Sequence, residues 1–177
     1  MSEHAPNPLA RRALAASVFT VVYNVIEGVV SMLLGAWAKS PALLGFGLDS
    51  FVEALSGGVM VWRFAKHDQL TAEEIEHREA RAIRLVGWTF LVLGAYVLYE
   101  AGEKLWRREP PAASPGGLLL AAVSIVVMLF LARAKRRLGA ALHSHSLLAD
   151  ATETVVCIWL SVSLLAGLGL NWLLGWW

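Results

Sequence analysis

Charge, cysteine and membrane-embedded histidine are all scarce in this 177-residue sequence. Only 16% of the residues are charged while 57% are hydrophobic, and the mean hydropathy of +0.58 is too apolar for an ordinary soluble domain. The formal net charge of +1 gives no reason to expect nucleic acid as a partner. The single cysteine, Cys157, excludes an intramolecular disulfide framework.

The residues that an enzyme would need are also missing. All five histidines fall outside the apolar runs, which argues against a buried bis-histidine haem. Glu73, Glu74 and Arg78 match an E-E-x3-R pattern of some intramembrane proteases, but they stand at the aqueous start of a predicted helix without a membrane-embedded histidine. Because no nucleophile–base pair can be assembled, we expect a protein that is not an enzyme.

Long apolar runs are what the sequence does have, and several reach the roughly 20 residues that cross a bilayer. They predict an all-α, polytopic membrane helical bundle, with a polar tail at residues 1–12 and a transmembrane domain at 13–177. The third helix should run from about residue 72 to 106, roughly 50 Å, with its first third in water. We expect an interfacial turn after residue 168. The five predicted spans are 14–37, 42–62, 85–102, 118–132 and 147–168.

Basic residues are divided unevenly between the two sides of this topology. With a cytoplasmic N-terminus, eleven of them lie inside and four outside, in accord with the positive-inside rule. The inside group includes a cluster that ends the fourth span. We therefore expect a multi-pass protein, in a bacterial plasma membrane, with its N-terminus in the cytoplasm. The inside residues are Arg11, Arg12, Arg63, Lys66, Arg78, Arg81, Arg84, Arg133, Lys135, Arg136 and Arg137, and the outside ones are Lys39, Lys104, Arg107 and Arg108.

Two carboxylates, Asp49 and Glu53, interrupt the otherwise apolar segment 43–62. Their i, i+4 spacing places both on one helix face. Each charge in the middle of a bilayer costs about 2.5–3.5 kcal/mol, so a compensating cation, protons or a cationic partner is required. Because the segment has no Lys, Arg or His, a bound metal ion or a pair of protons is the simplest compensation.

The fifth span carries a second polar stripe, formed by Asp150, Glu153 and Cys157 at i, i+3 and i+7. Facing Asp49 and Glu53, it would enclose a small cage whose carboxylates suit divalent ions and whose thiolate favours softer ones such as zinc. Simpler interpretations remain open here. Asp150 could cap its helix or sit among headgroups, and Cys157 could be a small buried hydrophobic residue.

These two helices resemble the transmembrane domain of the cation diffusion facilitator family. The phrase KSPALLGFGLDSFVE, Lys39 to Glu53, is similar to the family's second helix, and SHSLLADATETVVC, Ser144 to Cys157, is similar to its fifth. The resemblance implies homodimers with six spans and usually a soluble C-terminal domain. Because the sequence contains neither a sixth span nor that domain, we expect it to be a fragment of a divergent, compact member.

The resemblance also implies a metal site and an activity. The four implied ligands are Asp49, Glu53, Glu153 and Cys157, where usual members have His and Asp at the last two positions. Asp150 and Asn24 match residues that recur in the family and are expected to support the site. Glu27 is not part of the match, but it lies one turn from Tyr23 and Asn24 and is expected to be a partner of the ligands or a buried protonated acid. Spans one, two, four and five would enclose the cage, with the third outside.

The implied function is efflux of a divalent cation, zinc or a similar ion, in exchange for protons. Glutamate in place of His and cysteine in place of Asp change the hardness of the ligand set, so the metal itself cannot be carried over from the family. Two other functions remain open: a non-transporting membrane protein with a structural or regulatory metal site, and a cation channel with an acidic ring.

Overall fold

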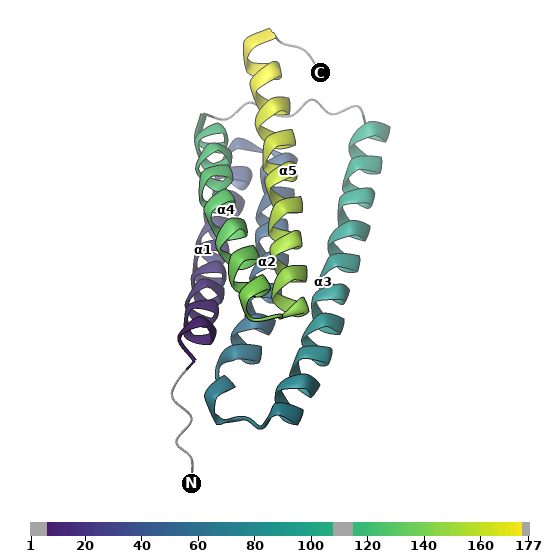
Figure 1. The fold of residues 1–177 in the computed structure, drawn as a ribbon. Coiled ribbons are helices and arrows are strands. Elements are labelled where there is room, and N and C mark those ends of the chain that lie inside the picture. Colours follow the sequence, from purple (N-terminus) through teal and green to yellow (C-terminus); the bar gives the residue numbers. More distant parts are fainter. Residues whose placement is uncertain (1–6, 108–114, 175–177) are drawn as a thin grey trace.

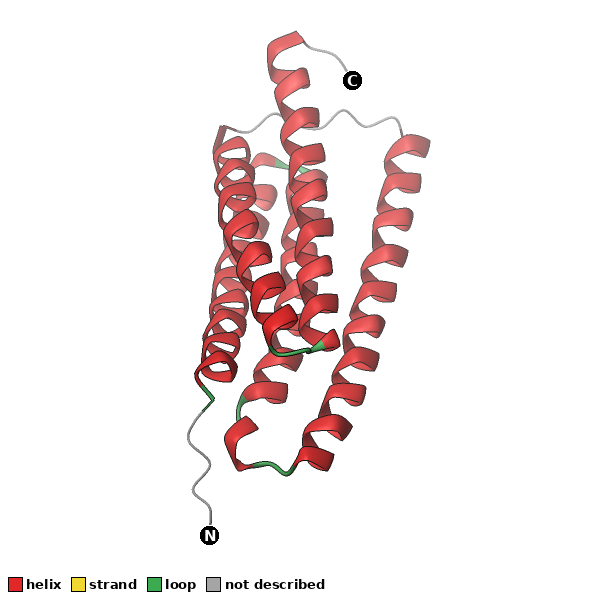
Figure 2. Cartoon of the chain, in the orientation of Figure 1, coloured by secondary structure: helices red, strands yellow, loops and turns green. Residues whose placement is uncertain are grey.

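The computed structural model describes residues 7–107 and 115–174, nearly all of them helical. No strand occurs in these residues (Figure 2). Consecutive long helices run in alternating directions (Figure 1), and five of them are long and apolar enough to cross a membrane. The prediction of an all-α membrane bundle is thereby confirmed. The elements are α1 (Pro8–Ala38), α2 (Pro41–Phe64), the 3-10 turn η1 (His67–Gln69), α3 (Ala72–Arg107), α4 (Pro115–Ala141) and α5 (His145–Leu174).

Two tight turns of the same kind precede α2 and α5. Lys39 ends α1 in the left-handed region with φ 50°, and the backbone N–H that follows it bonds to the Gly35 carbonyl at 2.9 Å. His143 repeats this after α4 with φ 49°, and the next N–H bonds to the Gly139 carbonyl at 2.9 Å. Such bonds satisfy the last carbonyls of a helix and reverse the chain in a few residues. Helices α1 and α2, and likewise α4 and α5, are therefore antiparallel neighbours.

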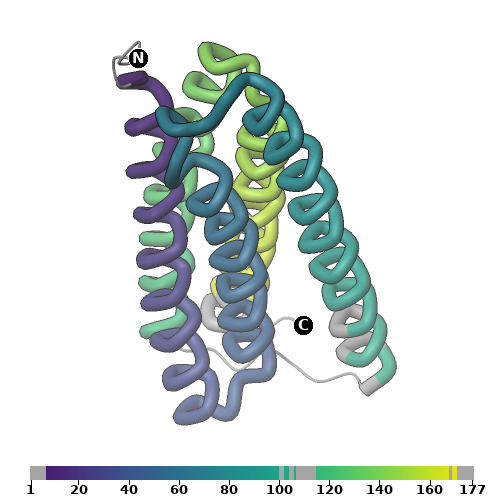
Figure 3. Tube along the Cα trace, turned by 90° about the horizontal axis from the view of Figure 1, so that it is seen from below, coloured from purple at the N-terminus to yellow at the C-terminus, as the bar shows by residue number. Residues whose placement is uncertain are grey.

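The four helices α1, α2, α4 and α5 form a bundle, and α3 stands to one side of it (Figures 1 and 3). This is the arrangement that the family resemblance implied. The start of α1 and the α2–α3 and α4–α5 connections lie at one end of the molecule, as the alternating directions require (Figure 1). That this end faces the cytoplasm remains a prediction.

Helices α1 and α2 approach each other closely where two glycines face. A Cβ atom on Gly28 would lie 3.1 Å from the Gly47 carbonyl, and one on Gly47 would lie 3.0 Å from the Gly28 carbonyl. Beyond this crossing, the Ser31 hydroxyl donates a hydrogen bond of 2.6 Å to the Leu43 carbonyl. Small residues permit this backbone approach, which is typical of helix pairs in membranes. The contact aligns α2 beside α1 over the segment that carries Asp49.

A single carboxylate ties the start of α3 to the bundle. Glu79 pairs with the Arg63 guanidinium of α2 at 2.6 Å and accepts hydrogen bonds from the Ser146 N–H at 2.7 Å and the Ser144 hydroxyl at 2.9 Å. These last two groups stand at the N-terminus of α5, where a helix has unpaired N–H groups. Glu79 thus joins α2, α3 and α5 at the end of the molecule where the N-terminus lies.

Two helices extend further than the sequence predicts. Helix α4 continues past residue 132 to Ala141, because the basic residues that end the apolar run are themselves good helix formers. Helix α5 continues to Leu174, so the predicted interfacial turn is wrong for residues 169–174, while 175–177 lie outside the described residues. The predicted capping box is confirmed, since the Thr71 N–H donates to the Glu74 carboxylate at 2.8 Å.

Candidate metal and ion-pair site

The predicted site residues of α2 and α5 are all buried inside the bundle. Asp49 is 4% exposed and Glu53 is 1% exposed, near the middle of the 24-residue helix α2. On α5, Glu153 is completely buried and Cys157 is 3% exposed. The two stripes therefore turn inward, not toward lipid, which is the arrangement that a membrane-embedded ion site requires.

Asp150 forms a fully buried ion pair that the sequence does not predict. The Lys135 ammonium of α4 lies 2.8 Å from Asp150 Oδ2, and both side chains have no exposed surface. The other carboxylate oxygen accepts a hydrogen bond of 2.8 Å from the Ser56 hydroxyl of α2. The suggestion that Asp150 caps its helix or sits among headgroups is therefore wrong, since α5 already begins at His145. Lys135 is also not part of a solvated basic cluster.

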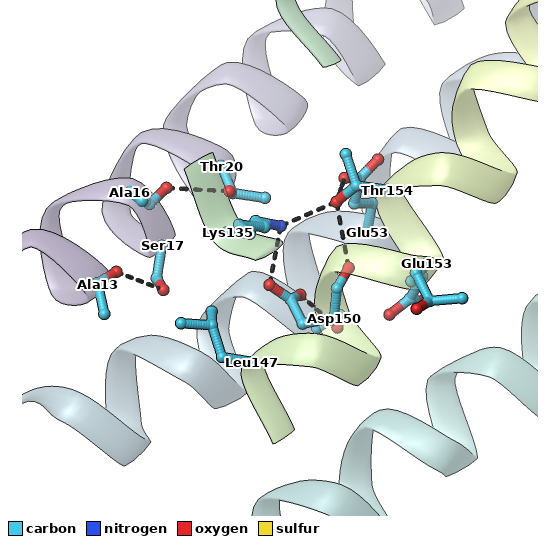
Figure 4. A network of polar contacts seen from close by, with 12 residues as sticks. Ala13, Ala16, Ser17, Thr20, Glu53, Lys135, Leu147, Asp150, Glu153 and Thr154 are labelled. Atoms are coloured by element: carbon cyan, nitrogen blue, oxygen red, sulfur yellow. Dashed lines mark hydrogen bonds and ion pairs between the residues drawn. The ribbon is translucent and has the colours of Figure 1, made fainter. Parts of the chain in front are cut away.

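The Thr154 hydroxyl joins this ion pair to Glu53. It accepts a hydrogen bond of 2.9 Å from the Lys135 ammonium and donates one of 2.7 Å to Glu53 Oε1. Figure 4 shows the three side chains meeting between α2, α4 and α5, with Asp150 beside them. A continuous polar chain therefore runs from the cation on α4 to the carboxylate on α2.

Glu153 lies further toward α3, separate from the ion pair (Figure 4). One of its oxygens, Oε2, lies 3.4 Å from the Thr89 hydroxyl of α3. Its other oxygen, Oε1, is buried without a hydrogen-bond partner, and so is Oε2 of Glu53. Buried carboxylate oxygens normally have donors, so two such atoms on facing helices are suited to an additional cationic ligand.

The four predicted ligands lie in the same region of the bundle, but their side chains do not surround a common position for an ion. Among the described residues, no three His, Cys, Asp or Glu side chains are arranged to hold a metal ion. Glu53 uses one oxygen for the bond from the Thr154 hydroxyl, and the Cys157 thiol is buried on the neighbouring helix α5. Metal ligation by Asp49, Glu53, Glu153 and Cys157 therefore stays a prediction, and it requires side chains to rotate from the positions seen here.

The residues of α1 form a separate polar layer beside the site. Glu27 is 3% exposed and accepts hydrogen bonds from the Tyr23 hydroxyl at 2.9 Å and the Ser50 hydroxyl at 3.0 Å. Asn24 is completely buried and donates to the Thr20 carbonyl at 3.0 Å, while its Oδ1 has no hydrogen-bond partner. Glu27 thus links α1 to α2 at Ser50, the residue that follows Asp49, and its supporting role stays a prediction.

Lys135 is the main residue that reasoning from sequence missed, although a signal for it exists. The buried residues of α4 repeat every three or four positions, and this stripe ends on Lys135 and Gly139. Its basic neighbours Arg133 and Arg136 fall off the stripe and are exposed. Continuing the helical period of α4 into the basic cluster would have separated the buried lysine from them. The earlier members of the stripe are Gly117, Ala121, Ser124, Met128, Leu131 and Ala132.

The fold and the buried side chains define a class: a polytopic helical membrane protein with several carboxylates inside the bundle. A family model described as the cation efflux transmembrane domain matches residues 14–177. The chain therefore belongs to the cation efflux family, whose members transport divalent metal ions.

The chain is also similar to a curated protein that is longer than it is. Transmembrane protein 163 of Xenopus laevis is 24% identical over 156 residues, which cover 88% of this chain and 54% of that protein. The chain thus spans about half the length of this curated relative. No solved structure matches the chain.

Proposed function

We propose that this chain exports a divalent metal cation from the cytoplasm in exchange for protons, using the acidic groups of α2 and α5 as the transport site. The observation that carries the proposal is the pair of buried carboxylate oxygens without donors, Glu53 Oε2 and Glu153 Oε1, on facing helices. Membership of the cation efflux family supplies the class of cargo. Carboxylate oxygens and a thiolate together suit borderline ions such as zinc.

The residues fit this role by their placement and chemistry. Asp49 and Glu53 stand one turn apart on α2, and Glu153 and Cys157 stand one turn apart on α5, all four of them buried. The contact between Glu153 and the Thr89 hydroxyl is long, at 3.4 Å, so breaking it costs the carboxylate little. When these four side chains rotate toward one another, the ion would take the place of contacts that they make in this conformation, among them the 3.4 Å contact of Glu153 with Thr89.

Exchange for protons follows from the use of one site by two cations. The metal binds to deprotonated carboxylates and thiolate, so protons arriving from the opposite side compete for the same atoms and release it. Rigid-body rocking of helices around a central site is the usual way in which such a site opens to each side in turn. Here the closely packed pair α1 and α2 would move against the pair α4 and α5.

Transport in liposomes tests the proposal. The purified chain is reconstituted and zinc, manganese, cobalt, cadmium and iron are offered under an imposed pH gradient. We expect saturable uptake driven by that gradient, and near-total loss after Asp49→Ala. Glu103→Ala, at the far end of α3 and remote from the site, is the matched control and should transport normally.

The other two functions give different results in the same assay. A channel with an acidic ring would conduct steeply with voltage and without saturation. A protein that uses the site only to hold a structural metal would bind the ion without moving it. Either result would replace the exchanger proposal.

A further inference from the structure

We infer that Lys135 is a resident cation of the transport site, and that its charge weakens the site's binding of divalent ions. This inference rests on the proposed function, since it concerns the same site. Five buried carboxylates and two buried cations occur among the described residues. One of the cations, Arg63, pairs with Glu79 at the N-terminal end of the molecule, which leaves Lys135 with the site.

The geometry places the lysine charge next to a predicted ligand without a direct bond to it. The Lys135 ammonium binds Asp150 at 2.8 Å and the Thr154 hydroxyl at 2.9 Å, and that hydroxyl binds Glu53 at 2.7 Å (Figure 4). One side chain therefore separates the ammonium from Glu53. The free oxygen of Glu53 remains open to another cation while the lysine stays in place.

The same contacts remove Asp150 from the set of ligands. One of its oxygens pairs with Lys135 and the other accepts from the Ser56 hydroxyl. A buried ammonium needs this partner, because an unpaired charge inside the bundle is strongly unfavourable. Asp150 therefore holds the Lys135 ammonium in place beside the site, while Glu53 and Glu153 keep their open oxygens for the transported ion.

A positive charge fixed beside a cation site reduces its affinity for a divalent ion. At the effective dielectric of protein interiors, unit charges several ångströms apart still interact strongly enough to change an affinity by about tenfold or more. A transporter gains from such weakening, because a site must release its ion as well as capture it. Lys135 would act as an electrostatic neighbour of the ion, and not as a ligand.

Metal titration of the detergent-solubilised full chain tests this inference. Zinc and cadmium are titrated at mildly alkaline pH into the parent, Lys135→Met, Lys135→Arg and the double variant Lys135→Met/Asp150→Asn. We expect Lys135→Met to bind each ion about tenfold or more tightly, because the opposing charge is gone. Lys135→Arg keeps the charge and should stay close to the parent. Arg136→Met, an exposed neighbour on α4, should also leave affinity unchanged.

The double variant separates charge from structure. It removes one positive and one negative group, so the net charge of the site is that of the parent, and we expect parental affinity. If Asp150 were instead a metal ligand, the double variant would bind more weakly than the parent, and this result would overturn the inference. Unchanged or weaker binding by folded Lys135→Met would overturn it as well, since a lysine that only holds α4 against α5 predicts no gain in affinity.

If Lys135→Met does not fold, a comparison of Asp150→Asn with the double variant tests the inference instead. Asp150→Asn leaves the lysine charge uncompensated and should bind about tenfold more weakly, while the double variant should return to the parental value. If Asp150→Asn and the double variant bound the ions equally weakly, the inference would be rejected. The parent titration keeps the two proposals apart: a parent that binds none of the ions refutes the transport function itself, whereas a binding parent with an indifferent Lys135→Met refutes only the role of Lys135.

Discussion

The four-helix bundle and helix α3 bury very different chemistry. Inside the bundle, α2, α4 and α5 bury carboxylates together with a lysine. Helix α3 exposes large apolar side chains such as Leu91, Leu98 and Tyr99 along its length. Its polar links to the other helices include Glu79 near its start and Thr89 beside Glu153.

This difference shows that hydrophobicity alone does not tell which side of a membrane helix faces lipid and which faces the protein. Apolar residues that are exposed in the structure are suited to contact with lipid, which needs no partner from the protein. Charged residues at the same depth must face one another inside the bundle. The bundle therefore holds the candidate site, and α3 contributes one hydroxyl to its edge.

The largest expected effect on transport comes from replacing a carboxylate in the bundle, and a carboxylate on α3 serves as its control. Glu53→Gln in the bundle should reduce metal transport about 100-fold or more, equivalent to about 3 kcal/mol, because the amide cannot replace an anionic ligand. Glu76→Gln, on the exposed surface of α3, should transport as the parent does. Initial rates in liposomes measure both, and equal rates for the two variants would remove the distinction between the regions.

The ion pairs of the two regions should differ in their effect on stability. Asp150→Ala leaves the buried lysine without a partner and should cost about 3–5 kcal/mol. On α3, Glu73 approaches His77 at 3.8 Å with both side chains largely exposed, so Glu73→Ala should have no measurable effect. Thermal unfolding in detergent gives the comparison. Equal midpoints for both variants would show that the buried pair does not hold the bundle together.

A smaller effect is expected from the thiol of α5. Cys157→Ser should retain transport but reduce the preference for zinc and cadmium over manganese by about tenfold, because sulfur selects softer ions. Competition uptake with pairs of ions measures this ratio. The neighbouring Thr152→Ser variant, on the exposed side of α5, should keep the parental preference. A ratio unchanged by Cys157→Ser would reject the cysteine as a ligand.

The smallest effect compares glycines of the two regions. Gly47→Ala should destabilise the protein by about 1–3 kcal/mol, since its Cβ would meet Met32 Cγ at 2.8 Å and the Gly28 carbonyl at 3.0 Å. A Cβ on Gly94 of α3 would have no atom within 4 Å, so Gly94→Ala should be neutral or slightly stabilising. Thermal unfolding again distinguishes them, and a stabilised Gly47→Ala would contradict the close crossing of α1 and α2.

Much of the candidate site could be predicted from particular residues. The i, i+4 spacing of Asp49 and Glu53 placed both on one face of α2, and the same argument grouped Glu153 with Cys157 on α5. Lys135 escaped prediction because a lysine in a run of basic residues at the end of an apolar segment resembles a solvated one. Thr154 escaped because a hydroxyl in a helix usually donates to its own backbone, whereas here the Asp150 carbonyl is the more distant of its two acceptors, at 3.2 Å against 2.7 Å for Glu53 Oε1.

The helical class, the number of apolar helices and the charged faces of α2 and α5 follow from the sequence alone. These properties depend on local hydrophobicity and on the helical period, which are written along one chain segment at a time. Only the tertiary structure decided that Lys135 of α4 neutralises Asp150 of α5, and that Thr154 joins them to Glu53. Pairing between buried charges depends on which helix faces meet in space, and the period of a single helix does not contain that information.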